Sequence, residues 1–312
     1  MSTVSHILPP DATESAPPSA AISARRPGIL SVYLALMKPK IILLLLITTI
    51  GAMFVAAGGA PDLNLLLWTI IGGALSAGGA NALNHYFDRD IDGFMYRTKR
   101  RPLPAGWVQP GRVIAFGISL CALAFLVFST QVNLLAAVLS LIGALYYIFI
   151  YTLWLKRRTP HNITIGGVAG AIPPLVGWAA VTGGLAPTAW ALFGIVFLWT
   201  PPHTWALTLM VQRDYARVDV PMLPVVAGEE ATYRQILIYS WGYVVFMLAL
   251  TPLGIFGWFY FLAALALSLL HLRDAYRIRR QRTNAAARGL YKFSLLQLAL
   301  LFIAMVIDIR LP

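Results

Sequence analysis

Long apolar stretches dominate the chain from about residue 38 onward and constrain its fold more than any other feature. A helix needs about 20 predominantly apolar residues to cross the hydrocarbon core of a bilayer. Spans of about this length are expected at residues 38–57, 63–84, 113–129, 134–151, 163–182, 189–211, 236–255, 258–272 and 293–309. The pattern predicts an all-α, polytopic membrane protein with about nine transmembrane helices. A proline pair, Pro201 and Pro202, is expected to interrupt the sixth of them.

The first 28 residues differ from the rest of the chain. Only 12% of all residues are charged, whereas soluble globular proteins have about 25%. Residues 1–28 are rich in Pro, Ser and Ala and lack the apolar core of a secretory signal. We therefore expect a disordered tail over residues 1–28 and a single transmembrane domain over residues 29–312.

Positive charge is unevenly distributed between the two sides of the predicted membrane domain. Of the 24 Lys and Arg residues, 23 fall in the tail or in loops that share its side of the membrane if nine helices cross. Cytoplasmic loops carry an excess of Lys and Arg. The N-terminus is therefore expected in the cytoplasm and the C-terminus outside it. Because topology accounts for the net charge of +12, no nucleic-acid partner is implied.

Three oxygen-bearing side chains lie four residues apart where the second span ends. They are Asn84, Asp88 and Asp92. Each step of four residues advances about 40° around a helix, so the three are expected to form one stripe on one face. Such oxygens are ligands for Mg²⁺. Asp90 points away from this stripe and is expected to form a salt bridge or a supporting contact.

Basic side chains follow the stripe within ten residues, in the segment RTKRRPLP at 97–104. Guanidinium groups bind phosphate oxygens. Carboxylates and basic groups together, at the water end of a membrane helix, predict a site for a diphosphate carried with Mg²⁺ and attached to an apolar group. Ordinary loop charge is the alternative for any one of these carboxylates.

A second acidic cluster, Asp214 and Asp219, follows the sixth span. Spans two and six both descend to the cytoplasm, so the two clusters are expected to face each other across a cavity. Aromatic faces can protect the allylic cation that remains when a diphosphate leaves. The candidates are Tyr86, Phe87, Tyr146, Tyr147, Tyr151 and Trp178.

The spacing of Asn84, Asp88 and Asp92 on the second span resembles the first aspartate motif of the UbiA superfamily of intramembrane prenyltransferases. Other segments resemble the protoheme IX farnesyltransferase (heme O synthase) family within that superfamily. They are MYRTKRRPLPAG at 95–106, residues 151–183 with LKRRTPHNITIGG, TPPHTWAL at 200–207 and DYARVDVPMLPVV at 214–226. The resemblance runs from about residue 38 to the last span.

The resemblance implies a UbiA-type bundle of helices around a central cavity, in a bacterial inner membrane, with the C-terminus periplasmic. It implies transfer of the farnesyl group of farnesyl diphosphate to a vinyl group of heme B, with a hydroxyl from water and release of diphosphate. Mg²⁺ is the implied cofactor. Heme A synthase or terminal oxidase assembly factors are the implied protein partners.

The resemblance also implies roles for individual residues. Asn84, Asp88, Asp92 and Asp214 match catalytic and metal-binding positions. Asp219 stands where the family often carries a small or uncharged residue, so a ligand and a plain loop residue remain alternatives. Basic side chains are the candidates for binding diphosphate: Lys38, Arg97, Lys99, Arg101, Lys156 and Arg157.

Three residues are candidates for binding the heme acceptor, namely His203, His85 and Asn81. His203 follows the proline pair, about 16 Å above Asp214 at 1.5 Å per residue. A histidine within a membrane is functional or bonded to a neighbouring helix, so heme contact and structural contact both stay open. His85 adjoins the acidic stripe, and Asn81 lies one turn above Asn84.

Other functions remain open on the residues alone. Another UbiA-type prenyltransferase, acting on a quinone precursor or another aromatic acceptor, would carry the same metal motif. A transporter of an anionic solute also uses intramembrane charges and broken helices. A non-catalytic heme or assembly scaffold is a third alternative.

Overall fold

A computed structural model describes residues 27–311; most of the predicted tail, residues 1–26, and residue 312 lie outside the described residues. All regular elements within 27–311 are helices, as the sequence predicts. They are α1 (Ile29–Met37), α2 (Pro39–Ala57), α3 (Leu63–Phe87), α4 (Arg89–Asp92), α5 (Pro110–Gln131), α6 (Leu134–Leu145), the π-helix η1 (Tyr146–Leu155), α7 (Asn162–Thr182), α8 (Pro187–Met210), α9 (Gln212–Ala216), α10 (Leu223–Val226), α11 (Gly228–Ala249), α12 (Trp258–Gln281) and α13 (Asn284–Asp308).

Each predicted span coincides with a long helix. Six segments are long and apolar enough to cross a membrane, namely α2, α3, α5, α6 together with η1, α7 and α13. The helices α8, α11 and α12 occupy the other three predicted spans and have 24, 22 and 24 residues. The all-α membrane fold is confirmed, and the count of nine crossings stays a prediction.

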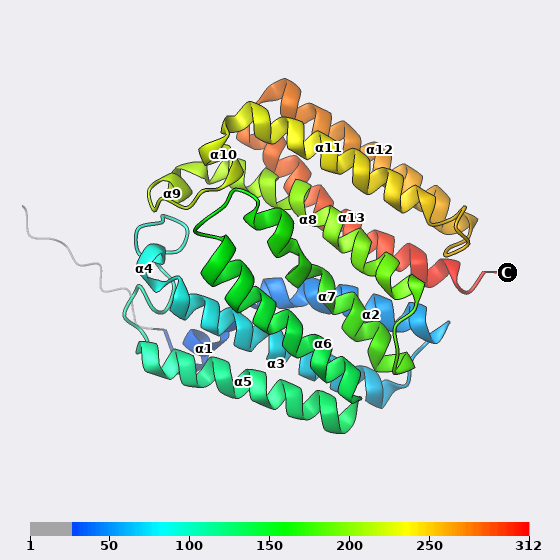
Figure 1. Ribbon diagram of the computed structural model, residues 1–312, viewed down its shortest axis with the longest axis horizontal. Helices are drawn as coiled ribbons and strands as arrows, with labels where there is room; N and C mark the ends of the chain where they lie inside the picture. Colours follow the sequence, from blue (N-terminus) through cyan, green and yellow to red (C-terminus); the bar gives the residue numbers. More distant parts are fainter. Residues whose placement is uncertain (1–26, 312) are drawn as a thin grey trace, which may run out of the picture.

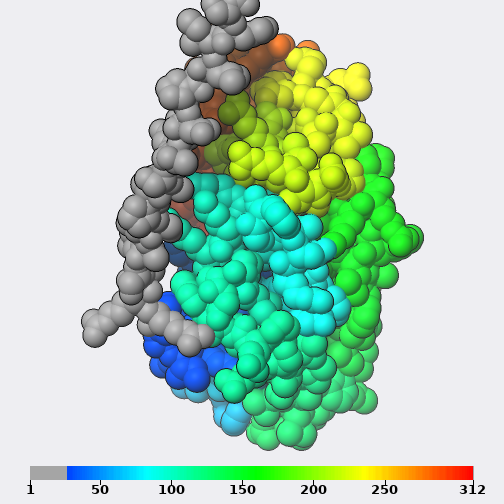
Figure 2. Space-filling view, turned by 90° about the vertical axis from the view of Figure 1, so that its left-hand side faces the viewer, coloured from blue at the N-terminus to red at the C-terminus, as the bar shows by residue number. Residues whose placement is uncertain are grey.

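The long helices form a closed bundle. Each packs against the next one in the chain, and α13 packs against α2. The pairs α2–α7 and α8–α13 also make contact. The short helices α4, α9 and α10 gather at one end of this bundle (Figure 1). Figure 2 faces that end, where the segment after α4 lies beside the segment around α9 and α10.

The prediction that Pro201 and Pro202 interrupt the sixth span is wrong. α8 continues through both prolines, and both are buried. Proline removes a backbone donor, so carbonyls one turn earlier lose their helical partner. Packing of α8 against α7, α11 and α13 holds the helix together across this defect. α7 likewise runs through Pro173 and Pro174.

Several helices extend beyond the predicted spans. α11 begins at Gly228, and α12 continues to Gln281. Their ends carry charged residues that give no hydropathy signal.

The two carboxylate oxygens of Asp308 accept hydrogen bonds from the amides of Gly257 and Tyr260, at 2.6 and 2.9 Å. This buried carboxylate satisfies amides at the start of α12 that lack helical partners.

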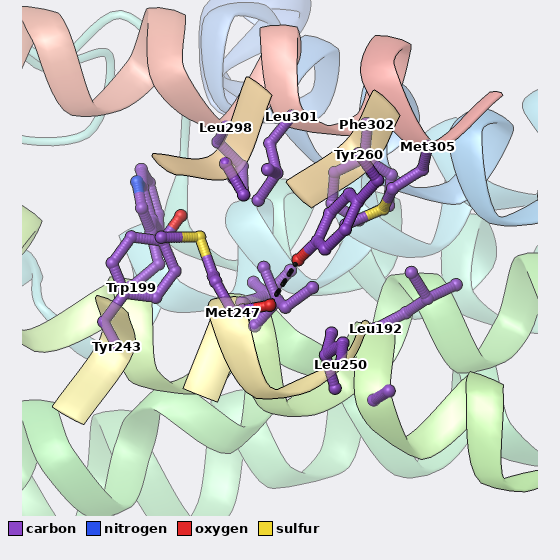
Figure 3. Close-up of a cluster of buried hydrophobic side chains, with 14 of the residues drawn as sticks. Leu192, Trp199, Tyr243, Met247, Leu250, Tyr260, Leu298, Leu301, Phe302 and Met305 are labelled. Atoms are coloured by element: carbon purple, nitrogen blue, oxygen red, sulfur yellow. Dashed lines mark hydrogen bonds between the residues drawn. The ribbon is translucent and has the colours of Figure 1, made fainter. Parts of the chain in front are cut away.

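The largest buried cluster joins α8, α11, α12 and α13 (Figure 3). Tyr260 of α12 donates its hydroxyl to the Met247 carbonyl of α11 at 3.1 Å, beside Phe302 of α13. Helices in a membrane associate through close packing and hydrogen bonds, because lipid is as apolar as the helix faces. The cluster therefore fixes α8, which leads into the second acidic cluster.

Small residues bring α2 and α7 together. A Cβ added at Gly177 would overlap the Thr49 carbonyl oxygen, so only glycine permits this approach of α7 to α2. These two helices form part of the wall of the central cavity described below.

Candidate active site

The predicted oxygen stripe is present, although the helix that carries it ends within it. α3 ends at Phe87, and Asp88 separates it from α4. Backbone hydrogen bonds of 2.9 Å still run from the Asp88 amide to the Asn84 carbonyl and from the Asp92 amide to the Asp88 carbonyl. Asn84, Asp88 and Asp92 therefore stay on one side, with 3%, 1% and 1% of their surfaces exposed.

Each stripe residue is paired with a different cation. Lys38 Nζ donates to Asn84 Oδ1 at 2.7 Å. Lys156 Nζ donates to Asp88 Oδ2 at 2.6 Å. Three of the six predicted diphosphate-binding residues thus converge on the stripe, namely Lys38, Lys156 and Arg101.

Arg101 bonds both oxygens of Asp92 through one guanidinium nitrogen, at 2.9 and 2.7 Å. A buried carboxylate without a cationic partner would be costly. The Lys38, Lys156 and Arg101 side chains supply that compensation here.

The other three predicted cations do not contact the stripe closely. The Arg97 and Lys99 side chains are exposed, and the Lys99 ammonium lies 4.8 Å from the centre of the Tyr96 ring. The Arg157 guanidinium pairs with Asp90 at 2.6 Å, which confirms the salt bridge expected for Asp90. Arg157 also approaches the stripe at Asp88 Oδ1, at 3.9 Å.

Asp214 bridges the two acidic segments. Its Oδ1 accepts from the Tyr96 amide at 3.1 Å, and its Oδ2 accepts from the Arg97 amide at 3.2 Å. The loop after the first motif thus docks onto the second, and Asp214 is 9% exposed. Asp219 is not brought into this contact. It lies exposed in the turn after α9, with a left-handed φ of 51°.

The stripe offers oxygen donors that suit a hard cation. Among residues 27–311, no group of three His, Cys, Asp or Glu side chains has the geometry of a formed metal site. Asp88 Oδ1 is nevertheless buried without a hydrogen-bond partner, and Arg157 lies 3.9 Å away from it. A buried carboxylate oxygen of this kind, flanked by an amide and a second carboxylate, fits the donor preference of Mg²⁺.

A cavity of about 300 Å³ lies between α2, α3, α6, η1, α7 and α8. Most of its wall is apolar or small, and Asn81, Tyr147 and Tyr151 line it. The Tyr147 and Tyr151 rings stack at 5.6 Å with an interplanar angle of 17°. Two of the six aromatic candidates, Tyr147 and Tyr151, therefore face the cavity.

The π-helix η1 positions the polar residues that meet the stripe. The Thr152 hydroxyl donates to the Tyr147 carbonyl, five residues earlier, at 2.8 Å. It also accepts from Asn84 Nδ2 at 3.1 Å. The sequence interpretation missed Thr152. Its spacing of four from Lys156 matches the spacing from Asn84 to Asp88, which is the signal that would have found it.

The three predicted heme-binding residues have different surroundings. Asn81 Nδ2 donates to the Met37 carbonyl at 2.9 Å, at the cavity wall. His85 is 1% exposed, and neither ring nitrogen has a hydrogen-bond partner among the described residues. Heme binding by Asn81 and His85 stays a prediction.

His203 faces α13. Its Nδ1 lies 2.7 Å from the Ser294 hydroxyl, and its ring stacks on Trp199 at 4.2 Å and on Tyr291 at 4.7 Å. It is absent from the lining of the 300 Å³ cavity, to which Thr200 and Thr204 of the same helix contribute. Of the two alternatives left open for His203, the structure favours the bond to a neighbouring helix.

A family model described as the UbiA prenyltransferase family matches residues 45–302. The chain belongs to the UbiA prenyltransferase family. This match confirms the resemblance that the aspartate motif indicated. The stripe of this UbiA family member lies within the matched residues.

Curated relatives narrow the similarity within the UbiA family. A protein named protoheme IX farnesyltransferase from Gloeobacter violaceus is 52% identical over 285 residues, covering 91% of this chain and 93% of the relative. One of the same name from Roseiflexus sp. (strain RS-1) is 53% identical over 287 residues, covering 91% of this chain. The chain spans 53% of the length of that Roseiflexus relative.

Solved structures share the UbiA fold at low sequence identity. A digeranylgeranylglyceryl phosphate synthase has a TM-score of 0.74 and 20% identity, covering 90% of this chain and 98% of that chain. A UbiA homolog from Archaeoglobus fulgidus, bound to GPP and Mg²⁺, has a TM-score of 0.60 and 15% identity, covering 88% and 99%. These likenesses establish the fold.

Proposed function

We propose that this protein converts heme B to heme O by transferring the farnesyl group of farnesyl diphosphate to a vinyl side chain. The single observation that carries the proposal is the buried stripe of Asn84, Asp88 and Asp92, each paired with a cation, beside an apolar cavity lined by Tyr147 and Tyr151. The names of relatives about 50% identical support heme as the acceptor.

We infer that Asn84, Asp88, Asp92 and Asp214 hold Mg²⁺. The unpartnered Asp88 Oδ1 and the Mg²⁺ bound to an archaeal UbiA homolog together with GPP support this assignment. When bound, Mg²⁺ neutralises charge on the departing diphosphate. Asp219 is left out of the set, because it is exposed and lies outside the contact made by Asp214.

Lys38, Arg101 and Lys156 bind the diphosphate in this scheme. Their amine and guanidinium groups already lie at the stripe, within hydrogen-bond distance of its oxygens. Placed there before the reaction, they stabilise the charge that develops on the leaving oxygen without having to reorganise. Arg97 and Lys99 lie further out and attract the anionic substrate from the water phase.

The cavity controls the fate of the farnesyl group. The bond between the allylic carbon and oxygen breaks, and the bond to the vinyl carbon forms. Water then adds its hydroxyl to the other vinyl carbon and releases one proton. The stacked Tyr147 and Tyr151 present aromatic faces to the allylic cation, and the apolar wall limits premature attack by water. Asn81 is the side chain of the wall that we assign to the acceptor.

We also propose the cellular setting. The uneven Lys and Arg distribution supports a cytoplasmic N-terminus and a periplasmic C-terminus in a bacterial inner membrane. A single membrane domain, residues 29–312, follows the short tail. Heme A synthase or terminal oxidase assembly factors are the expected recipients of the product.

Prenyl transfer to a different acceptor is the second candidate function, because the role proposed for the stripe concerns only the prenyl donor. The test supplies the purified protein with farnesyl diphosphate, Mg²⁺ and either heme B or an aromatic quinone precursor. Mass spectrometry should detect heme O and no prenylated quinone precursor. Prenylation of the quinone precursor alone would establish the second candidate. Family membership favours both over a transporter or a scaffold.

A further inference from the structure

Asp90 of α4 and Arg157, the second residue after η1, form a bidentate ion pair. Arg157 donates from two guanidinium nitrogens to the two Asp90 oxygens, at 2.6 and 2.7 Å. Bidentate pairs of this kind fix orientation as well as charge.

Arg157 also closes the end of α3. The guanidinium nitrogen that bonds Asp90 Oδ1 donates to the Phe87 carbonyl at 2.9 Å. Phe87 is the last residue of α3, and terminal carbonyls of a helix lack partners within it. One side chain therefore ties α3 to α4 across Asp88, the residue at which the backbone changes direction.

Lys156, the residue before Arg157 in the chain, contacts the stripe itself. Lys156 bonds Asp88, and Arg157 bonds Asp90 two residues further on. The two residues that follow η1 thus contact the α3–α4 junction at Asp88 and at Asp90. Lys156 bonds the buried stripe at 2.6 Å, whereas the Arg157 side chain is 34% exposed, pairs with Asp90 and lies 3.9 Å from Asp88 Oδ1.

We propose that Asp90 and Arg157 are positioning residues that hold the α3–α4 junction so that Asp88 stays in line with Asn84 and Lys156, and that Arg157 is not a diphosphate ligand. The proposal rests on the proposed function of the stripe as the site for Mg²⁺ and farnesyl diphosphate. It replaces the role that the sequence resemblance implies for Arg157.

A double-mutant cycle separates positioning from ligation. The variants are Asp90→Ala, Arg157→Ala and the double substitution, and calorimetry measures binding of farnesyl diphosphate in the presence of Mg²⁺. The Asp90 carboxylate does not bind diphosphate directly, so a loss in Asp90→Ala that disappears in the Arg157→Ala background acts through Arg157. We expect each single variant to weaken binding about tenfold, and the double variant to be no weaker than either.

Two further measurements exclude a general loss of structure. The Mg²⁺ concentration that gives half-maximal heme O formation should rise equally in all three variants. The thermal midpoint should stay near that of the wild type, because exposed ion pairs contribute little to stability. The reversed pair, Asp90→Arg with Arg157→Asp, should recover part of the lost affinity. Arg157→Lys, which keeps the charge and loses the bidentate contact, should be weakened to an intermediate degree.

A matched control lies away from the proposed site. Arg282 donates to Glu230 at 2.6 Å, and both side chains are more than half exposed. Glu230→Ala and Arg282→Ala should leave binding unchanged.

Wild-type affinity in Asp90→Ala would overturn the proposal, and so would losses in the two single variants that add up in the double variant. Calorimetry needs no acceptor, so failure to form heme O would reject the proposed function without affecting this test.

Discussion

Lys156 donates a hydrogen bond of 2.6 Å from Nζ to Asp88 Oδ2, joining residues 68 positions apart in the chain. Both residues are buried, with 8% and 1% of their surfaces exposed. Removing one partner of such a pair leaves an uncompensated charge, whereas replacing both can be nearly neutral. The pair therefore matters both for the stability of this buried region and for the binding of Mg²⁺ and diphosphate that we propose there.

Asp88→Asn should abolish turnover while leaving the protein folded. The amide keeps the shape of the side chain and loses the negative charge that we assign to Mg²⁺ binding. We expect heme O formation to fall by a factor on the order of 10² or more, measured by mass spectrometry. Glu230→Gln in the same protein is the comparison, because Glu230 lies away from the stripe and its side chain is more than half exposed. Turnover near the wild-type rate in Asp88→Asn would remove the metal-site assignment.

Lys156→Met should affect stability as well as activity. It leaves the Asp88 carboxylate buried without its closest cation, which costs about 3 kcal/mol of unfolding free energy. Binding of farnesyl diphosphate should weaken as well, as calorimetry can measure. Lys40→Met is the matched control, because the Lys40 side chain is exposed and has no role in the proposed site. Equal effects of both substitutions would contradict a special role for Lys156.

Sequence patterns located the spans because apolar length is a local property, and α2, α3 and α7 begin within one residue of the predicted limits. The pairing of Lys156 with Asp88 depends on how η1 packs against α3, and nothing in the sequence near either residue specifies it. The π-helix itself was not predicted, because a change from i→i+4 to i→i+5 bonding leaves the apolar pattern of residues 146–155 intact. Arg157 was predicted to bind diphosphate because a basic residue beside Lys156 looks equally suited to that role, and its ion pair with Asp90 likewise depends on packing that the nearby sequence does not specify.

His203→Phe should leave heme affinity unchanged. Phenylalanine keeps the stacking on Trp199 and Tyr291 and loses the bond to Ser294. The expected cost is about 1 kcal/mol of stability, and Ser294→Ala should cost a similar amount. Spectroscopic titration with heme B measures the affinity. A large loss of affinity in His203→Phe, with none in Ser294→Ala, would instead assign His203 to heme.

Gly177→Val should disrupt the cavity wall. The added side chain would overlap the Thr49 backbone and push α7 away from α2, and we expect a loss of about 2–3 kcal/mol. The change in thermal midpoint on purified protein measures this. Gly184→Ala lies where an added Cβ meets no atom within 4 Å, so its midpoint should stay unchanged. A stable, fully active Gly177→Val protein would show that the approach of α2 and α7 is not required.

The central claim is that the buried stripe activates farnesyl diphosphate for transfer to heme B. The most direct measurement incubates the wild-type protein and Asp88→Asn with heme B, farnesyl diphosphate and Mg²⁺ in water labelled with heavy oxygen, followed by mass spectrometry of the heme fraction. The account predicts that the wild type produces heme O carrying the heavy oxygen in its new hydroxyl group, and that Asp88→Asn produces almost none. Unmodified heme B from the wild-type protein, or equal product from both proteins, would contradict it.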